Sequence, residues 1–267
     1  MCPEFKTVLY EKKNAVAIIT LNRPKKLNAL NSQMNKDIKY ALKEAKDDKE
    51  VRAIILTGAG RGFCSGADVS DFSGGVTLRD FKKMTEEGIT PETIITPYDL
   101  IDVPKPIIAA VNGVAVGFGM NVLLNCDIIY ASEDASFGEF FIRMAVIPDM
   151  NGSLLLPMLV GIHKAKELIF TGDRIDAQEA LRIGLVNKVF PADQLMSETM
   201  KLANKLAEGP PLALAMSKKI IHEGFKKIFD KMLLNEVQYQ AKLYTTRDHR
   251  EAAMAFLEKR KPKFKGK

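Results

Sequence analysis

Two segments rich in small residues follow buried hydrophobic runs and could together hold a negatively charged group. Gly62–Asp68 follows the run VRAIILT, and Asn112–Asn121 follows KPIIAAV. In parallel α/β sheets, ligands bind beyond the carboxyl ends of the strands. Glycines there let backbone N–H groups approach a ligand, and a helix that starts in the second segment adds a favourable dipole. We therefore expect an anion-stabilising site at these turns; tight packing is the alternative explanation for either turn alone.

Several other site motifs are excluded by spacing. After Gly117-x-Gly119, the dinucleotide fingerprint needs glycine or alanine at position 122, where Val122 stands. Ser65 lies outside any G-x-S-x-G motif, and there is no Gly-Lys-Ser/Thr phosphate loop. The three cysteines and three histidines show no metal-ligand spacing. We expect no metal site.

Strands and helices alternate in the first half of the chain, which favours parallel βαβ units. Asn31 or Ser32 caps a helix that extends to Asp47, and another helix covers 117–124. After Leu154 the sequence is mostly helical. Within the alternating first half, the long polar segment 68–103 is typical of a lid. The expected strands are 16–21, 51–57, 105–111 and 127–131, and the later helices 164–170, 177–183, 192–208, 212–225, 230–244 and 250–261.

The charge is concentrated in the basic tail. The last ten residues, EKRKPKFKGK, carry +5 of the net +6, so the rest of the chain is nearly neutral. We interpret the tail as a solvated end; contact with nucleic acid or a coenzyme phosphate is the alternative. The sequence lacks a transmembrane run and a signal pattern, so our default expectation is a soluble cytoplasmic protein, with no membrane among its partners.

Six segments, in this order and spacing, resemble the crotonase family of enoyl-CoA hydratases and isomerases. The resemblance implies a spiral of ββα repeats in residues 1–200, with the coenzyme A and catalytic sites, followed by a C-terminal helical trimerisation region in 201–267. It also implies a homotrimer or hexamer, an acyl-CoA substrate, and no cofactor beyond the coenzyme A of that substrate. The segments are LNRPKKLNAL, FCSGADV, KPIIAAVNGVAVGFG, CDIIYASEDASF, LIFTGDRIDAQEALRIGLVNKV and FLEKRK.

The resemblance also assigns an oxyanion hole and a coenzyme A site. The hole consists of the backbone N–H groups of Ala67 and Phe118, and it stabilises a thioester enolate. Phe118 stands where glycine is usual, which narrows the acyl pocket. Asp68 braces its loop, and Lys259 of the tail is expected to meet coenzyme phosphate, on the same or a neighbouring subunit. The other coenzyme A positions are Lys26, Leu27, Cys64, Ser65, Gly66, Ala67, Asp68 and Val69.

Two glutamates that hydratases of this family use are missing, because Asn121 and Phe141 occupy their positions. Asp149, in the segment VIPDMNG, falls where isomerases of the family carry their base. A double-bond shift needs one base and one oxyanion hole, so the resemblance favours an enoyl-CoA isomerase with a Pro-Asp base. Phe118, Phe140, Phe141 and Met120 could keep that pocket dry.

Alternatives remain open at this stage. Asp149 could instead cap a helix that begins near 151–154, which would lower its pKa, or act as a nucleophile as in dehalogenating relatives. Glu139 reaches the same pocket if its segment is extended, which would allow an enoyl-CoA hydratase with Asp149 and Glu139 as its acid and base. An RNA-binding protein of the same fold is a third alternative, which the nearly neutral body of the chain disfavours.

Overall fold

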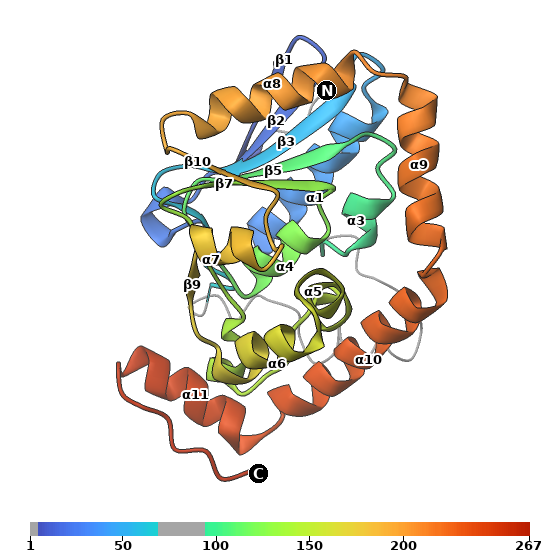
Figure 1. The fold of residues 1–267 in the computed structure, drawn as a ribbon. Coiled ribbons are helices and arrows are strands. Elements are labelled where there is room, and N and C mark those ends of the chain that lie inside the picture. Colours follow the sequence, from blue (N-terminus) through green and yellow to red (C-terminus); the bar gives the residue numbers. More distant parts are fainter. Residues whose placement is uncertain (1–4, 69–93) are drawn as a thin grey trace.

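The computed structural model describes residues 5–68 and 94–267, and a six-stranded sheet organises the described part of the chain (Figure 1). The strand order is β1-β2-β3-β5-β7-β10; β1 is antiparallel to β2, and every other neighbouring pair is parallel. The four expected strands are confirmed, each within two residues. The strands are β1 (Val8–Lys13), β2 (Val16–Leu21), β3 (Ala53–Gly58), β5 (Ile107–Val111), β7 (Ile128–Ser132) and β10 (Lys188–Phe190).

A second sheet of short strands, β4-β6-β8-β9, was not predicted. The segments 62–68 and 112–121 were interpreted as turns, but each contains a strand. Strands of two or three residues are too short to show a period in the sequence. Because β4, β6 and β8 directly follow β3, β5 and β7, the chain repeats a long-strand, short-strand unit in a spiral. The strands are β4 (Gly62–Cys64), β6 (Val114–Val116), β8 (Ser136–Gly138) and β9 (Ile175–Asp176).

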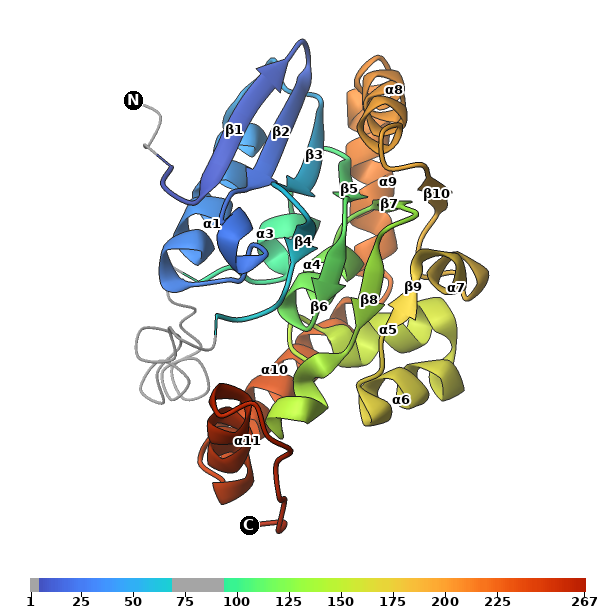
Figure 2. The same cartoon turned by 90° about the vertical axis from the view of Figure 1, so that its left-hand side faces the viewer.

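Helices cover both faces of the larger sheet (Figure 2). Helix α1 (Ser32–Asp47) packs on β1 and β2, and α8 (Leu195–Ala207) packs on the opposite face against β3, β5 and β7. The predicted domain boundary at residue 200 falls inside α8. This helix packs on the sheet as one continuous element. The other helices are η1 (Pro24–Lys26), α3 (Tyr98–Ile101), α4 (Phe118–Leu124), η3 (Phe140–Met144), α5 (Gly152–Val160), α6 (Ile162–Thr171), α7 (Ala177–Arg182), α9 (Pro211–Glu223), α10 (Lys226–Tyr244) and α11 (Arg247–Leu257).

Helix α1 forms as its sequence predicts. The Asn31 side chain accepts a hydrogen bond from the Met34 N–H at 2.9 Å and caps the helix. Its buried face consists of Met34, Asp37, Ile38, Ala41, Leu42 and Ala45, at helical spacing. The helix therefore has both a capping signal at its start and an apolar face against the sheet.

The C-terminal region differs from expectation at two points. Helix α10 begins at Lys226 rather than Asp230, and α11 ends at Leu257 rather than Lys261. The basic tail then folds back along α11. Arg260 pairs with Glu251, and Asp248 accepts hydrogen bonds from the backbone N–H groups of 265 and 266, both at 2.7 Å. The tail is exposed, as expected for a solvated end, and it is also bound to its own helix.

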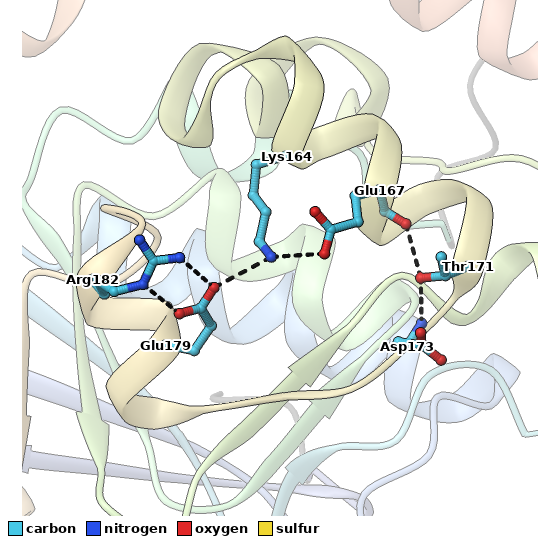
Figure 3. A network of polar contacts seen from close by, with 6 residues as sticks. All are labelled: Lys164, Glu167, Thr171, Asp173, Glu179 and Arg182. Carbon is cyan, nitrogen blue, oxygen red and sulfur yellow. Dashed lines mark hydrogen bonds and ion pairs between the residues drawn. The ribbon is translucent and has the colours of Figure 1, made fainter.

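A surface network ties α6 to α7 (Figure 3). Lys164 Nζ lies 2.9 Å from the Glu167 carboxylate and 3.2 Å from that of Glu179. Arg182 donates two hydrogen bonds to Glu179, at 2.6 and 2.7 Å. Exposed ion pairs of this kind add little stability, so the network mainly sets how the two helices meet. Among the helices of the described ranges, none is both long and apolar enough for a membrane crossing.

Candidate active site

The two glycine-containing turns lie side by side at the ends of neighbouring strands. Strands β4 and β6 are paired in parallel, with Cys64 opposite Ala115. Gly117, just after β6, has φ +54°, and its N–H donates to the Gly138 carbonyl oxygen at 2.9 Å. A Cβ placed on Gly117 would lie 3.9 Å from Gly66 Cα. The expected meeting of the two turns is therefore found in the structure.

Both predicted oxyanion donors have backbone N–H groups that are not engaged elsewhere in the backbone of the described ranges. Leu30 binds the residues on either side of Ala67: its N–H donates to Gly66, and its carbonyl accepts from Asp68, both at 2.8 Å. The Ala67 N–H consequently faces away from Leu30. Phe118 is the first residue of α4, where a helix leaves its N–H groups unpaired. The geometry fits an oxyanion hole.

The predicted coenzyme A residues of the first two segments also come together. The Ser65 N–H donates to the Leu27 carbonyl at 3.0 Å, and the Ser65 hydroxyl donates to the Lys26 carbonyl at 3.3 Å. Asn28 is fully buried, and its amide donates to the carbonyl oxygens of Ala59 and Gly62 at 2.9 and 2.7 Å. This amide fixes the segment after η1 against the turn before β4. Sequence reasoning did not single out Asn28.

Asp68 is buried and pairs with Arg23 across 2.7 Å, which joins the loop before η1 to the first oxyanion turn. The contact agrees with the bracing role expected for Asp68.

Cys64 is buried, and burial raises the pKa of its thiol to about 12, so the thiol stays protonated. Val69 and most of the predicted lid lie outside the described residues.

Asp149 lies on the loop before α5, next to the helix that begins at Phe118. The Asn121 amide donates to the Asp149 carbonyl oxygen at 2.9 Å, and the Asn125 amide donates to the Met150 carbonyl at the same distance. Asp149 Oδ1 is shielded from solvent and has no hydrogen-bond partner among the described residues. Burial raises the Asp149 pKa to about 7, partly offset by its hydrogen bonds. A carboxyl group of this kind can gain and lose a proton near neutral pH.

The helix-capping alternative for Asp149 is wrong. Helix α5 begins at Gly152, and the carboxylate at its N-terminus belongs to Glu236 of α10, which accepts from the N–H groups of Asn151 and Ser153 at 2.7 and 2.9 Å. A capping carboxylate at 149 would have a lowered pKa, whereas the Asp149 pKa is raised. Asp149 contributes only its backbone carbonyl, which accepts from the Gly152 N–H.

Glu139 follows β8 directly and is fully buried. Neither of its carboxyl oxygens has a hydrogen-bond partner among the described residues. Its pKa is raised well above the ordinary value, first by burial and then by the charges of Asp149 and Glu236. The electrostatic interaction indicates that Glu139 and Asp149 share one low-dielectric region. The segment is not extended there, because β8 ends at Gly138 and η3 begins directly after Glu139, so the contact of Glu139 with the pocket stays a prediction.

Aromatic side chains border the second turn. The position for a Cβ on Gly117 lies 3.9 Å from Phe141 Cζ, so Phe141 stands against the oxyanion turn. Phe118 and Met120 of α4 are buried, whereas Phe140 is half-buried, with the Arg143 guanidinium 3.8 Å from the centre of its ring. The apolar surroundings agree with the dry pocket that the sequence predicts.

Lys259 is exposed after the end of α11. In the described ranges, no hydrogen bond or ion pair joins it to the segment 23–28 of the same chain. Its predicted contact with coenzyme phosphate remains a prediction. Within the same ranges, no cluster of three His, Cys, Asp or Glu side chains could hold a metal ion.

Comparison with known proteins identifies the family. The family model described as enoyl-CoA hydratase/isomerase matches residues 11–267. The chain belongs to the enoyl-CoA hydratase/isomerase family. A protein named short-chain-enoyl-CoA hydratase, from Clostridium acetobutylicum, is 41% identical over 259 residues, which cover 97% of both chains. A crotonyl-CoA hydratase from Syntrophomonas wolfei is 35% identical and covers 97% of this chain and 98% of its own.

Solved structures confirm the crotonase fold. A crystal structure of an enoyl-CoA hydratase/isomerase from Pseudoalteromonas atlantica superposes with a TM-score of 0.88, at 33% identity, over 97% of this chain and 100% of that one. This chain is therefore an enzyme of a family that acts on acyl-CoA thioesters. The two relatives named above are hydratases, so the comparisons favour the hydratase alternative over the isomerase prediction.

Proposed function

We propose that this enzyme hydrates a short-chain enoyl-CoA, with Asp149 and Glu139 in place of the two glutamates that its family pattern leads one to expect. The observation that carries the proposal is the pair of buried carboxyl groups near the oxyanion turns, both with raised pKa values. Hydration needs a base for water and an acid for carbon, and two buried carboxyl groups can supply one of each. The names of the two hydratase relatives support the same choice.

The proposed steps assign one role to each of the two buried carboxyl groups. Asp149, with a pKa of about 7, is largely ionised above neutral pH and takes a proton from water. The water oxygen bonds to C3 of the enoyl group, and the electron pair of the double bond moves into the thioester enolate. The N–H groups of Ala67 and Phe118 hold the enolate oxygen. In this proposal Glu139, whose pKa is raised by burial so that it holds a proton more tightly, gives that proton to C2 and completes the 3-hydroxyacyl-CoA.

Isomerisation remains the second candidate, favoured by Phe141 against the oxyanion turn and by the absence of both family glutamates. Here Asp149 alone takes a proton from C2 of a 3-enoyl-CoA and returns it to C4. An apolar wall that excludes water would protect the dienolate. Glu139 would then be a structural carboxyl group, and Glu139→Gln would keep most of the activity.

Incubation in heavy-oxygen water separates the two functions. The protein is given crotonyl-CoA in one reaction and 3-hexenoyl-CoA in the other, and the products are analysed by mass spectrometry. Hydration predicts 3-hydroxybutyryl-CoA with one heavy oxygen at C3. An unlabelled 2-hexenoyl-CoA, with no hydroxyacyl product from crotonyl-CoA, would overturn the hydratase proposal in favour of isomerisation.

A further inference from the structure

The loop that carries Asp149 is held from the C-terminal helix α10. Glu236 is 3% exposed, and its two carboxyl oxygens accept from the N–H groups of Asn151 and Ser153 at 2.7 and 2.9 Å. One turn further along α10, Gln240 Oε1 accepts from the Ile147 N–H at 3.1 Å. These hydrogen bonds hold the loop on both sides of Asp149. Figure 1 shows α10 running beneath α5.

The loop that α10 binds has an unfavourable backbone conformation, which needs contacts from elsewhere to hold it. Met150 and Asn151 have φ angles of +53° and +61°, in the left-handed region that residues with a side chain rarely adopt. The Asn151 amide donates to the Phe229 carbonyl of α10 at 3.2 Å. Because this conformation directly follows Asp149, the bonds from α10 determine where the Asp149 carboxyl group lies.

We propose that Glu236 is a positioning residue for Asp149: by binding the two N–H groups that follow it, Glu236 fixes the catalytic carboxyl beside the oxyanion turns and makes α10 part of the active site. This inference rests on the proposed role of Asp149 as the base. In this proposal Glu236 does not contact the substrate. It acts on Asp149 in two ways, through the position of the loop and through its own charge.

The groups around the two carboxyls are mostly acidic or neutral. The Asp149 charge acts on Glu139 after β8, on Cys64 of β4, and on Glu236 and Tyr244 of α10. Of the nearby basic side chains, Arg143 of η3 stacks on Phe140, and His249 of α11 binds the Met144 carbonyl oxygen. Burial, and then the Asp149 charge, raises the Glu236 pKa to about 7 against its hydrogen bonds. Because Coulombic repulsion acts on both partners, we expect loss of the Glu236 charge to make Asp149 easier to ionise.

The test is a titration of Asp149 by carbon NMR in the full-length chain with labelled aspartate carboxyl groups. The signal that disappears in Asp149→Asn identifies Asp149. In Glu236→Gln, which keeps an acceptor but removes the charge, the midpoint should fall by roughly one pH unit. The kcat for crotonyl-CoA should fall about 10- to 100-fold, with KM changed less than about threefold, because the loop is displaced while the coenzyme A segments are untouched.

Glu223→Gln on α9 is the matched control, since Glu223 is exposed and pairs only with Lys219. It should leave both the midpoint and kcat unchanged. A folded Glu236→Gln protein with the wild-type midpoint and kcat would overturn the proposal. If that variant does not fold, Glu236→Asp takes its place; it keeps the charge but shortens the reach, and an unchanged kcat would then contradict positioning.

The two proposals can fail separately. If wild-type protein does not convert crotonyl-CoA, the hydratase function falls, but the NMR midpoint still tests whether Glu236 acts on Asp149. In the double variant Asp149→Asn, Glu236→Gln, the second change should reduce activity no further, because Glu236 acts through Asp149. A further tenfold loss in the double variant would show that Glu236 acts independently of Asp149 and would contradict the proposal.

Discussion

Asn121 donates a hydrogen bond of 2.9 Å to the carbonyl oxygen of Asp149, which joins the helix that begins at one oxyanion donor to the loop that carries the buried carboxyl group. By the family resemblance, Asn121 occupies a position at which the hydratases have a glutamate. Its amide fixes the loop but cannot move a proton at neutral pH. The proposed function therefore assigns the acid–base chemistry to Asp149, which Asn121 holds. The contact also leaves no space for a longer residue at 152, because a Cβ on Gly152 would lie 2.4 Å from Asn121 Nδ2.

The pH dependence of kcat/KM should be bell-shaped. Asp149 must be ionised, so activity should rise as pH passes through about 7. Glu139 must be protonated, so activity should fall at higher pH, when its raised pKa is exceeded. Measurement with crotonyl-CoA between about pH 5 and 10 tests both limbs. A rate that is independent of pH across the neutral range would contradict the assignment of the base.

Loss of the Ala67 N–H should reduce kcat by about 10² to 10³-fold, because one oxyanion donor contributes about 2.7 to 4 kcal/mol in the transition state. Ala67→Pro removes the donor, and Ala67→Gly keeps it as the matched control. Steady-state kinetics with both variants, after circular dichroism has shown that they fold, measures the difference. Equal activities in the two variants would exclude this N–H from the hole.

Asp68→Asn should weaken binding of the coenzyme A thioester and lower stability. Arg23 then keeps its partly buried charge without the carboxylate 2.7 Å away. We expect a loss of about 2 to 3 kcal/mol in the free energy of unfolding, below the value for a fully buried pair, and a larger rise in KM than fall in kcat. Asp47→Asn, which breaks the exposed pair with Lys43, should change neither quantity measurably. A KM equal to that of wild type would separate Asp68 from the binding segment.

Asp149→Asn should stabilise the protein at pH 8 but not at pH 4. The folded pKa of about 7 lies above the ordinary value of 3.8, so the folded state binds the proton more tightly and loses stability as pH rises between those values. The neutral amide removes a penalty of roughly 2 to 4 kcal/mol at pH 8. Denaturant unfolding at both pH values tests the sign. Destabilisation at pH 8 would mean that the carboxylate is paired in the folded state.

The sequence predicted the parts of the fold and site that depend on local pattern. Long apolar runs such as VAIITL predicted the larger sheet, and the resemblance to the family placed Ala67 and Phe118 on two turns that the structure brings together. The smaller sheet escaped prediction because its strands of two or three residues show no period. Glu236 also escaped, because its role comes from a contact with Asn151, a residue 85 positions away in the chain. No local signal in α10 marks such a contact.

The most direct test of the account is the activity of Asp149→Asn toward crotonyl-CoA, compared with Asp173→Asn at an exposed position. The account predicts that kcat falls about 10² to 10⁴-fold in Asp149→Asn, as expected for loss of a general base, with substrate affinity unchanged by calorimetry. Asp173→Asn should match wild type. Full turnover by a folded Asp149→Asn enzyme would contradict the assignment of Asp149 as the base.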